Sequence, residues 1–372
     1  MKKIILITII LLGISCLNGC ANNPPLKSAI CKQDLLYLHN YLQKNDAGII
    51  NTQNVQAAAF LEKAASTQLN NTAQLIEQNH CLKILHSYVR HYRKGHLDVS
   101  KTKPANNYLS FLTNATIKTV LAPSVELLSK DTLLIDIPSF NHLLKAEFND
   151  ILADNWQLLS ETPNWIIDLT SNGGGSDATF GLLQSLIVTS PIHMDGIELL
   201  VTTENIQAYK NMAAKYDVEH LLSAHTKFMQ QQPTYGFALY KPAQLQPVEP
   251  LKAEFNKPKL VVLLTSERCA SSCEQFVLNV KNSTNVVLVG QNTAGVIDIS
   301  NQVDHTLPSS LFDVRYSISR STRVISGNPI DGVGIEPDFK LELSRGKKAK
   351  QSNITQVQEM IELGKLELNQ YK

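Results

Sequence analysis

Apolar and polar residues follow two different patterns, one before and one after about residue 100. Over residues 30–100 the apolar side chains recur at helical spacing, and the segment 54–69 is rich in alanine. The apolar stripes of the outer two segments comprise Leu35, Leu38 and Leu42, and Leu75, Leu82, Leu85 and Val89. We predict a small N-terminal helical bundle, whose last helix ends near Gly95 because glycine is common just past a helix C-terminus.

Residues 101–345 show short apolar runs bounded by turn residues. Four runs predict buried strands: 132–140, 164–175, 259–267 and 285–293. The segments 176–190 and 272–282 predict helices that follow strands. This alternation is typical of an α/β fold. Residues 191–257 are less regular, and we interpret them as an insertion that serves as a lid or faces substrate. A C-terminal helix is expected within 346–372.

The N-terminus, "MKKIILITIILLGISCLNGC", has two lysines before an apolar run and is typical of a signal peptide over residues 1–19. Its ending, "LNGC", resembles the bacterial lipobox, which implies that Cys20 is lipidated and begins the mature chain. Ala21 after the cysteine implies an outer-membrane address, with the protein facing the periplasm. Residues 20–29 would form a tether. The alternative is an ordinary secreted protein with an unmodified Cys20.

Charge and cysteine usage restrict the partners. Loss of Lys2 and Lys3 leaves 32 basic residues against 33 acidic ones, without a basic tract, which argues against nucleic acid as a partner. Nothing indicates a cofactor. The mature chain keeps four further cysteines, an even number suited to disulfides in an oxidising compartment. Three pairings are open, the local one joining Cys31 to Cys81 and Cys269 to Cys273; metal ligation is disfavoured because no histidine lies at ligand spacing.

Two stretches carry candidate chemistry. In "IIDLTSNGGGSDATF" a buried strand runs into three glycines, which allow backbone N–H groups to point together at a developing negative charge. A phosphate site and a plain turn are alternatives, and Ser176 or Asp177 would cap the following helix. In "LTSERCASSCEQF" a strand ends and a helix begins within a few residues, so a serine there suits either a nucleophile or an N-cap.

Taken together, these stretches resemble peptidase family S41, which includes tail-specific proteases and interphotoreceptor-retinoid-binding-protein-like relatives. "TLLIDIPSF", "DLTSNGGG", "ASSCE", "VGQNTAG" and "GVGIEPD" follow the order of the family's motifs, with Thr170 where arginine is usual. The resemblance implies a spiral ββα core like that of Clp protease and crotonase. It also implies that Ser271 is the nucleophile, that Glu274 is its matching acid, and that Ser272 and Gly174 supply the oxyanion N–H groups.

The resemblance leaves the base to be assigned. Tail-specific proteases use a lysine at the position of Val296, which can take no proton. A branch similar to the tricorn core uses a histidine after the N-terminal helices, which corresponds to His96 in "RKGHLDV". The same branch places an acidic residue at Asp331, which would orient the imidazole. The alternatives are a surface histidine at a helix C-terminus and a turn aspartate.

The expected function is therefore that of a lipid-anchored serine peptidase of the cell envelope, acting on peptides or proteins. One alternative is a non-catalytic module of the same fold that binds an apolar ligand or a peptide. Another is a lipoprotein scaffold for an envelope partner. Arg320 and Arg323 are further candidates, either for a substrate carboxylate or as charges on the face of a strand.

Overall fold

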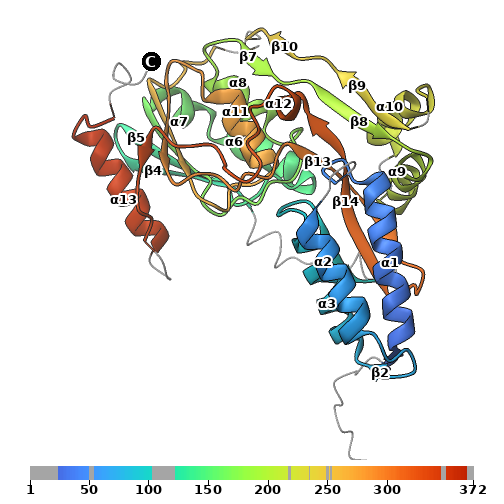
Figure 1. Cartoon of the computed structure of the whole chain (residues 1–372). Helices are drawn as coiled ribbons and strands as arrows, with labels where there is room; N and C mark the ends of the chain where they lie inside the picture. Colours follow the sequence, from blue (N-terminus) through green and yellow to red (C-terminus); the bar gives the residue numbers. More distant parts are fainter. Residues whose placement is uncertain are drawn as a thin grey trace, which may run out of the picture.

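The computed structural model describes residues 24–49, 54–102, 122–216, 219–233, 235–248, 251, 254–344 and 349–366. Cys20, the signal peptide and residues 20–23 of the tether lie outside these residues, so the predictions for them stay predictions. The tether was predicted to reach residue 29, but a strand begins at Leu26 and a helix at Ser28, so it ends by residue 25. Two sheets organise the described part (Figure 1). The mixed α/β class expected from the sequence is confirmed.

The larger sheet has six strands in the order β15-β12-β11-β6-β5-β4. All four runs predicted as buried strands lie side by side in it and are parallel. Its strands are β4 (Ser124–Ser129), β5 (Thr132–Asp136), β6 (Asn164–Asp168), β11 (Leu260–Thr265), β12 (Val286–Gly290) and β15 (Phe339–Lys340). β4 runs antiparallel to β5 at one edge.

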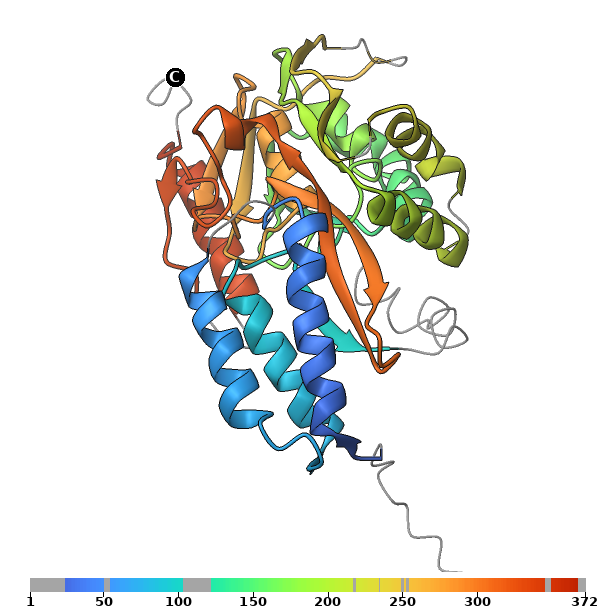
Figure 2. The same cartoon turned by 45° about the vertical axis from the view of Figure 1, so that its right-hand side comes forward.

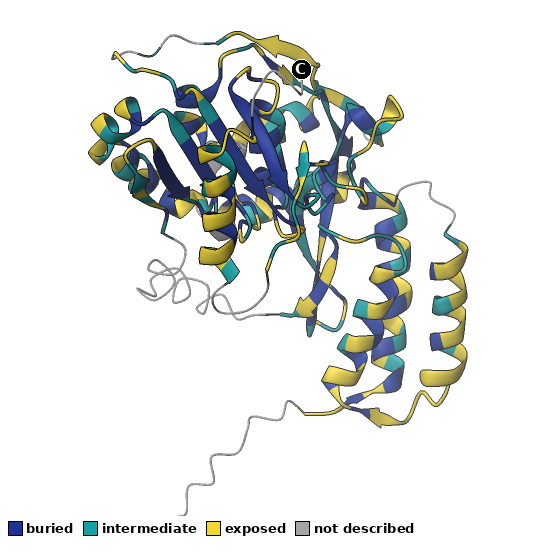
Figure 3. Ribbon diagram, turned by 90° about the vertical axis from the view of Figure 1, so that its left-hand side faces the viewer, coloured by how far each residue is buried: buried dark blue, intermediate teal, exposed yellow. Residues whose placement is uncertain are grey.

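Helices cover both faces of this sheet, which is why its central strands β6, β11 and β12 are apolar at consecutive positions. One core packs α6 (Lys145–Asp154), α7 (Trp156–Glu161), α8 (Gly181–Ile187) and α11 (Ser272–Val280) on alternate strand residues such as Trp165 and Leu263. The other face carries α13 (Ala349–Glu362), which packs on the intervening residues such as Ile166 and Val262. Figure 3 shows α13 with its outer side exposed. The predicted C-terminal helix is thus present.

The second sheet has the order β13-β14-β8-β9, with β3 also paired to β14. Its strands are β3 (Asp98–Lys101), β8 (Ile197–Val201), β9 (Gly236–Lys241), β13 (Ile299–Thr306) and β14 (Phe312–Ser321). The shorter elements are β1 (Leu26–Lys27), β2 (Leu75–Ile76), β7 (Ile192–Met194), β10 (Gln244–Gln246), α12 (Thr322–Ile325) and two turns of irregular helix, Ala64–Gln68 and His142–Leu144.

The N-terminal helices are α1 (Ser28–Asn45), α2 (Val55–Lys63) and α3 (Gln78–Arg90). They lie beside the second sheet (Figure 2), and α1 and α3 share one hydrophobic core with β3, β8 and β14. A disulfide joins Cys31 of α1 to Cys81 of α3, with Cα atoms 5.8 Å apart. The last helix ends at Arg90, not near Gly95, which lies in the turn that follows and has a φ of 76°.

The segment 191–257 is more regular than its sequence indicates. It contains β7, β8, β9 and β10 together with α9 (Thr203–Tyr216) and α10 (Glu219–Gln230). Two of its strands extend the second sheet, and its two helices pack on each other. Among the residues that the structure describes, no helix has the length and apolarity of a membrane span.

Candidate active site

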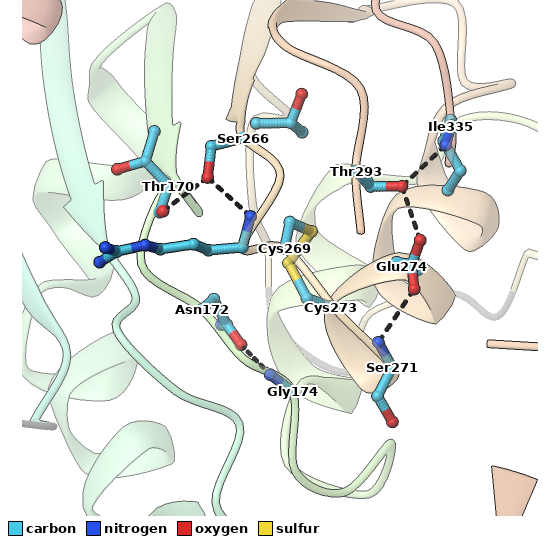
Figure 4. Close-up of a disulfide and its surroundings, with 12 residues drawn as sticks. Thr170, Asn172, Gly174, Ser266, Cys269, Ser271, Cys273, Glu274, Thr293 and Ile335 are labelled. Atoms are coloured by element: carbon cyan, nitrogen blue, oxygen red, sulfur yellow. Dashed lines mark hydrogen bonds between the residues drawn. A yellow bond between two sulfur atoms is a disulfide. The ribbon is translucent and has the colours of Figure 1, made fainter. Parts of the chain in front are cut away.

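Ser271 lies at the junction where β11 has ended and α11 begins. It is the N-cap residue of α11 and has φ 58° and ψ −121°, a backbone conformation that costs free energy for any residue with a Cβ atom. The disulfide Cys269–Cys273, predicted as the local pairing, is present and spans this junction with Cα atoms 5.3 Å apart (Figure 4). Both cysteines are fully buried. The disulfide therefore cross-links the residues on either side of Ser271 and constrains the strained turn.

Glu274 ties this turn to the loop after β12. Its carboxylate is fully buried and accepts four hydrogen bonds. The donors are Ser271 N–H at 3.1 Å, Val296 N–H at 3.0 Å, Gly295 N–H at 2.8 Å and the Thr293 hydroxyl at 2.6 Å. In Figure 4 the Ser271 side chain points away from Glu274. The carboxylate therefore binds the backbone N–H of Ser271 and not its hydroxyl.

The glycine loop after β6 meets the nucleophile turn because β6 and β11 are parallel neighbours, whose carboxyl ends share one edge of the sheet. The Ala270 N–H donates to the carbonyl of Asn172 at 3.2 Å, and the Ser266 hydroxyl donates to the carbonyl of Thr170 at 2.7 Å. The Thr170 hydroxyl donates to Asp168 at 2.6 Å. Threonine at the position where arginine is usual thus binds the carboxylate of its own strand end.

Gly174 of the glycine loop lies against Ser271 and has a φ of +95°. A Cβ atom on it would lie 2.9 Å from Cβ of Ser271 and 3.1 Å from the nitrogen of Ser272, so only glycine leaves this space open. The N–H of Gly174 itself donates to the Asn172 side chain at 2.8 Å (Figure 4). The N–H of Ser272 is at the first helical position, where no intrahelical acceptor exists. The neighbouring Gly175 lines the same cavity as Ser271, and its N–H donates to no protein acceptor within the described residues.

His96 lies in the same cavity as Ser271. Its Nδ1 is 2.8 Å from the carbonyl oxygen of Ile299, and because a carbonyl can only accept, Nδ1 carries the proton. Nε2 is thereby left with its lone pair. Burial, with a smaller contribution from Arg93, lowers the pKa of His96, so the ring is neutral at pH 7. No hydrogen bond joins His96 to Ser271 within the described residues.

Asp331 is connected to the His96 imidazole through the backbone of Ile299. Its carboxylate accepts from the N–H of Asp298 at 2.7 Å and from the N–H of Ile299 at 3.3 Å. Asp298 returns the contact by accepting the N–H of Asp331 at 2.9 Å. Burial raises the pKa of Asp331 to about 6, and the neighbouring Asp298 adds to the shift. The direct contact expected between Asp331 and the imidazole is made instead by the Ile299 carbonyl.

The cavity that contains Ser271 and His96 has a volume of about 670 Å³. Arg320 and Arg323 line it, but both are paired. Arg320 binds Glu198 at 2.7 Å, and Arg323 binds Asp298 at 2.8 Å and also Asp195. No group of three or more potential metal ligands occurs within the described residues.

Two features of this site were missed from the sequence. The Ile299 carbonyl has no residue signature, since every residue has a carbonyl group. Ser176 and Asp177 do not cap α8, which begins at Gly181 after Phe180; both residues line the cavity instead. Their position directly after the glycine loop was the sequence signal that could have placed them in the wall of the cavity.

Solved structures with the same architecture include proteases. Mature CPAF complexed with lactacystin has 12% identity to the chain and a TM-score of 0.57, and the alignment covers 90% of this chain and 97% of that one. A peptidase candidate from Parabacteroides merdae ATCC 43184 has 15% identity and a TM-score of 0.51, with coverage of 88% and 96%. At these identities the likeness concerns the fold. No curated protein matches the chain.

The sequence profile of peptidase family S41 matches residues 131–341. This range is more than half of the chain and contains the glycine loop, Ser271, Glu274 and Asp331. The chain therefore belongs to peptidase family S41.

Proposed function

We propose that the protein is a serine peptidase that hydrolyses peptide bonds, with Ser271 as nucleophile and His96 as base. One observation carries the proposal. A serine on a strained turn at a helix N-terminus and a neutral histidine, whose Nδ1–H is held by the Ile299 carbonyl, line a single cavity. A nucleophile, a base and a group that orients the base are the parts that serine acyl transfer requires.

In the first step the Ser271 oxygen attacks the substrate carbonyl carbon while Nε2 of His96 takes the hydroxyl proton. The carbonyl oxygen gains the negative charge. The N–H of Ser272 lies at the positive end of α11 and is suited to stabilise it. The second donor comes from the glycine loop. Gly175 N–H is suited as it stands, whereas Gly174 N–H would have to leave Asn172 or share its hydrogen bond.

In the second step the imidazolium of His96 gives its proton to the departing amine, and the C–N bond breaks. A water molecule then attacks the Ser271 ester with His96 again taking a proton, which releases the acid and regenerates the serine. Asp331 acts on these steps by holding the N–H of Ile299, the residue whose carbonyl fixes the imidazole. It is thus a positioning residue.

We further propose that the protein is anchored in the bacterial cell envelope through a lipid on Cys20. The two disulfides of the described chain support an oxidising compartment, since such bonds are rare in the cytosol. In a membrane fractionation of the expressing bacterium, the wild type should sediment with the membranes. Cys20→Ala has no thiol to accept a lipid and should remain unlipidated. Recovery of both forms in the soluble periplasmic fraction would contradict the anchor.

The test of catalysis uses residues 21–372 and a fluorophosphonate probe, which labels only an activated serine. Wild type should be labelled, and Ser271→Ala and His96→Ala should not. The non-catalytic binding module is the second candidate, favoured by Thr170 in place of arginine and by the absence of a Ser271–His96 hydrogen bond within the described residues. An unlabelled wild type would contradict the peptidase and favour that candidate.

A further inference from the structure

One wall of the catalytic cavity consists of side chains from the segment 191–257. Tyr209 and Met212 come from α9, His225 from α10 and Tyr240 from β9, and all four line the cavity that contains Ser271. We call these four residues the aromatic wall. The His225 ring lies 4.5 Å from the Tyr240 ring and 5.5 Å from the Tyr209 ring, measured between centroids. The wall is thus one continuous packed surface.

The packing behind the wall is apolar. Phe228 stacks edge-on against Tyr240 at 5.1 Å, and Met229 beside it is fully buried. Tyr209 is itself buried, while Met212, His225 and Tyr240 are half-buried and so keep part of their surface toward the cavity. Half-buried rings and a thioether offer apolar area that a ligand can still cover, which is the main source of favourable free energy in such sites.

The wall carries no formal charge. Burial, with a smaller contribution from Lys241, lowers the pKa of His225 to about 4, so its ring is neutral at pH 7. Its Nδ1 is buried without a hydrogen-bond partner within the described residues. A charged substrate group placed here would lose its hydration without gaining a counter-ion from the wall.

The other charged residues of the cavity lie outside the aromatic wall. Arg320, Arg323 and Asp195 are engaged in ion pairs with one another or with neighbouring acids. Lys241 is exposed, and its ammonium lies 5.6 Å from the centroid of the Tyr240 ring. An acidic side chain of a substrate can therefore pair with Lys241 at the edge of the aromatic wall, whereas the four side chains of the wall offer no counter-ion.

We propose that the aromatic wall is a specificity subsite that binds a bulky apolar side chain of the substrate, such as phenylalanine, leucine or methionine. This inference rests on the proposed peptidase function, because it uses the same cavity. It gives the segment 191–257 a function, since three of its elements converge to build the wall. It also names the substrate class, namely peptides with a large apolar residue near the scissile bond.

The test measures binding separately from catalysis. Ser271→Ala protein is titrated into fluorescent, capped hexapeptides of alanine and serine that differ at one central position, and binding is followed by anisotropy. Peptides with Phe or Leu should bind about 10- to 100-fold more tightly than the peptide with Ala, which corresponds to burial of one large side chain. The peptide with Lys should bind no better than the Ala peptide.

β9 offers a matched pair of variants at two neighbouring positions, of which one lines the cavity and the other does not. Tyr240 faces the cavity, whereas Leu239 is 51% exposed and does not line it. In the Ser271→Ala background, Tyr240→Glu should weaken Phe-peptide binding at least tenfold and favour the Lys peptide. Leu239→Glu should leave the preference unchanged. Met212→Glu, from a different element, should repeat the effect of Tyr240→Glu.

Equal binding of the Phe, Ala and Lys peptides, or equal effects of Tyr240→Glu and Leu239→Glu, would overturn the subsite. Thermal unfolding of each variant identifies any that has lost its fold. Fluorophosphonate labelling of the wild type tests the peptidase function separately. An unlabelled wild type whose Ser271→Ala form still prefers the Phe peptide would contradict the function and support the subsite.

Discussion

The imidazole of His96 and the carbonyl of Ile299 form a hydrogen bond of 2.8 Å, and the N–H of the same Ile299 donates to Asp331 at 3.3 Å. The carboxylate is therefore connected to the histidine through the backbone of one residue of β13. In a serine triad the aspartate contacts the imidazole directly. Here a neutral carbonyl fixes the tautomer, and the acid fixes the strand that carries the carbonyl.

Asp331→Asn should accordingly cost little compared with loss of a direct triad aspartate. In a direct triad the change from Asp to Asn lowers kcat by about 10⁴, because the wrong tautomer is stabilised. At this site the Ile299 carbonyl still selects the tautomer, so we expect a fall of about tenfold in the rate of fluorophosphonate labelling. His96→Ala should abolish labelling. A fall near 10⁴ in Asp331→Asn would show that the carboxylate contacts the imidazole during reaction.

The pKa of Asp331 predicts how stability depends on pH. Its folded-state value of about 6 lies above the ordinary 3.8, so the fold favours the protonated carboxyl. The contribution to stability is present below the unfolded pKa and is lost as the pH rises through about 6. Relative to Asp331→Asn, the wild type should therefore lose up to about 3 kcal/mol of unfolding free energy between pH 4 and pH 7. Urea denaturation of both proteins at the two pH values measures this; a difference independent of pH would contradict it.

Gly174 and Gly173 provide a test of the space beside the nucleophile. Gly174→Ala places a methyl group 2.5 Å from the Ala270 carbonyl oxygen and 3.1 Å from the Ser272 nitrogen, at a φ of +95°. We expect labelling to fall by about 10² or more, as when an oxyanion donor is lost. Gly173→Ala meets no atom within 4 Å and should label like wild type. Equal labelling of the two variants would remove Gly174 from the site.

The sequence predicts the core of this fold better than the details of its site. The four central strands could be predicted because helices bury both their faces, which makes consecutive positions apolar. The nucleophile turn could be predicted because serine, cysteine and glycine identities are visible in the sequence. The partner of the His96 ring could not, because a backbone carbonyl is common to all residues and only the fold places Ile299 beside His96. The regular structure of 191–257 was missed for a related reason: β8 and β9 join the second sheet through the pairing of β8 with β14, which is far away in the sequence.

The two disulfides should differ in their effect on stability and on the nucleophile. Chain entropy predicts that removing Cys31–Cys81, which closes a loop across a sequence separation of 50, costs about 4 kcal/mol. Removing Cys269–Cys273, with a separation of 4, costs about 2 kcal/mol. The double alanine variant of the second pair should nevertheless label more slowly, because the strained Ser271 turn loses its cross-link. Urea denaturation and labelling rates compare the two variants. If both variants are folded and the Cys31–Cys81 variant shows the larger fall in labelling rate, the proposed role of Cys269–Cys273 in holding the Ser271 turn would be contradicted.

Glu274→Gln tests whether the buried carboxylate sets the geometry of the nucleophile turn. The carboxylate accepts four hydrogen bonds, whereas a glutamine side chain has one acceptor oxygen and turns its NH₂ group toward two of the four donors. Two buried donors without acceptors should cost about 2–5 kcal/mol of unfolding free energy. Labelling of Ser271 should fall as well, because the N–H of Ser271 is one of the four donors. Glu336→Gln, at an exposed position where the carboxylate pairs with Lys340, is the matched control and should change neither quantity. A Glu274→Gln protein that unfolds at the wild-type urea midpoint and labels at the wild-type rate would show that the turn is held by the disulfide alone.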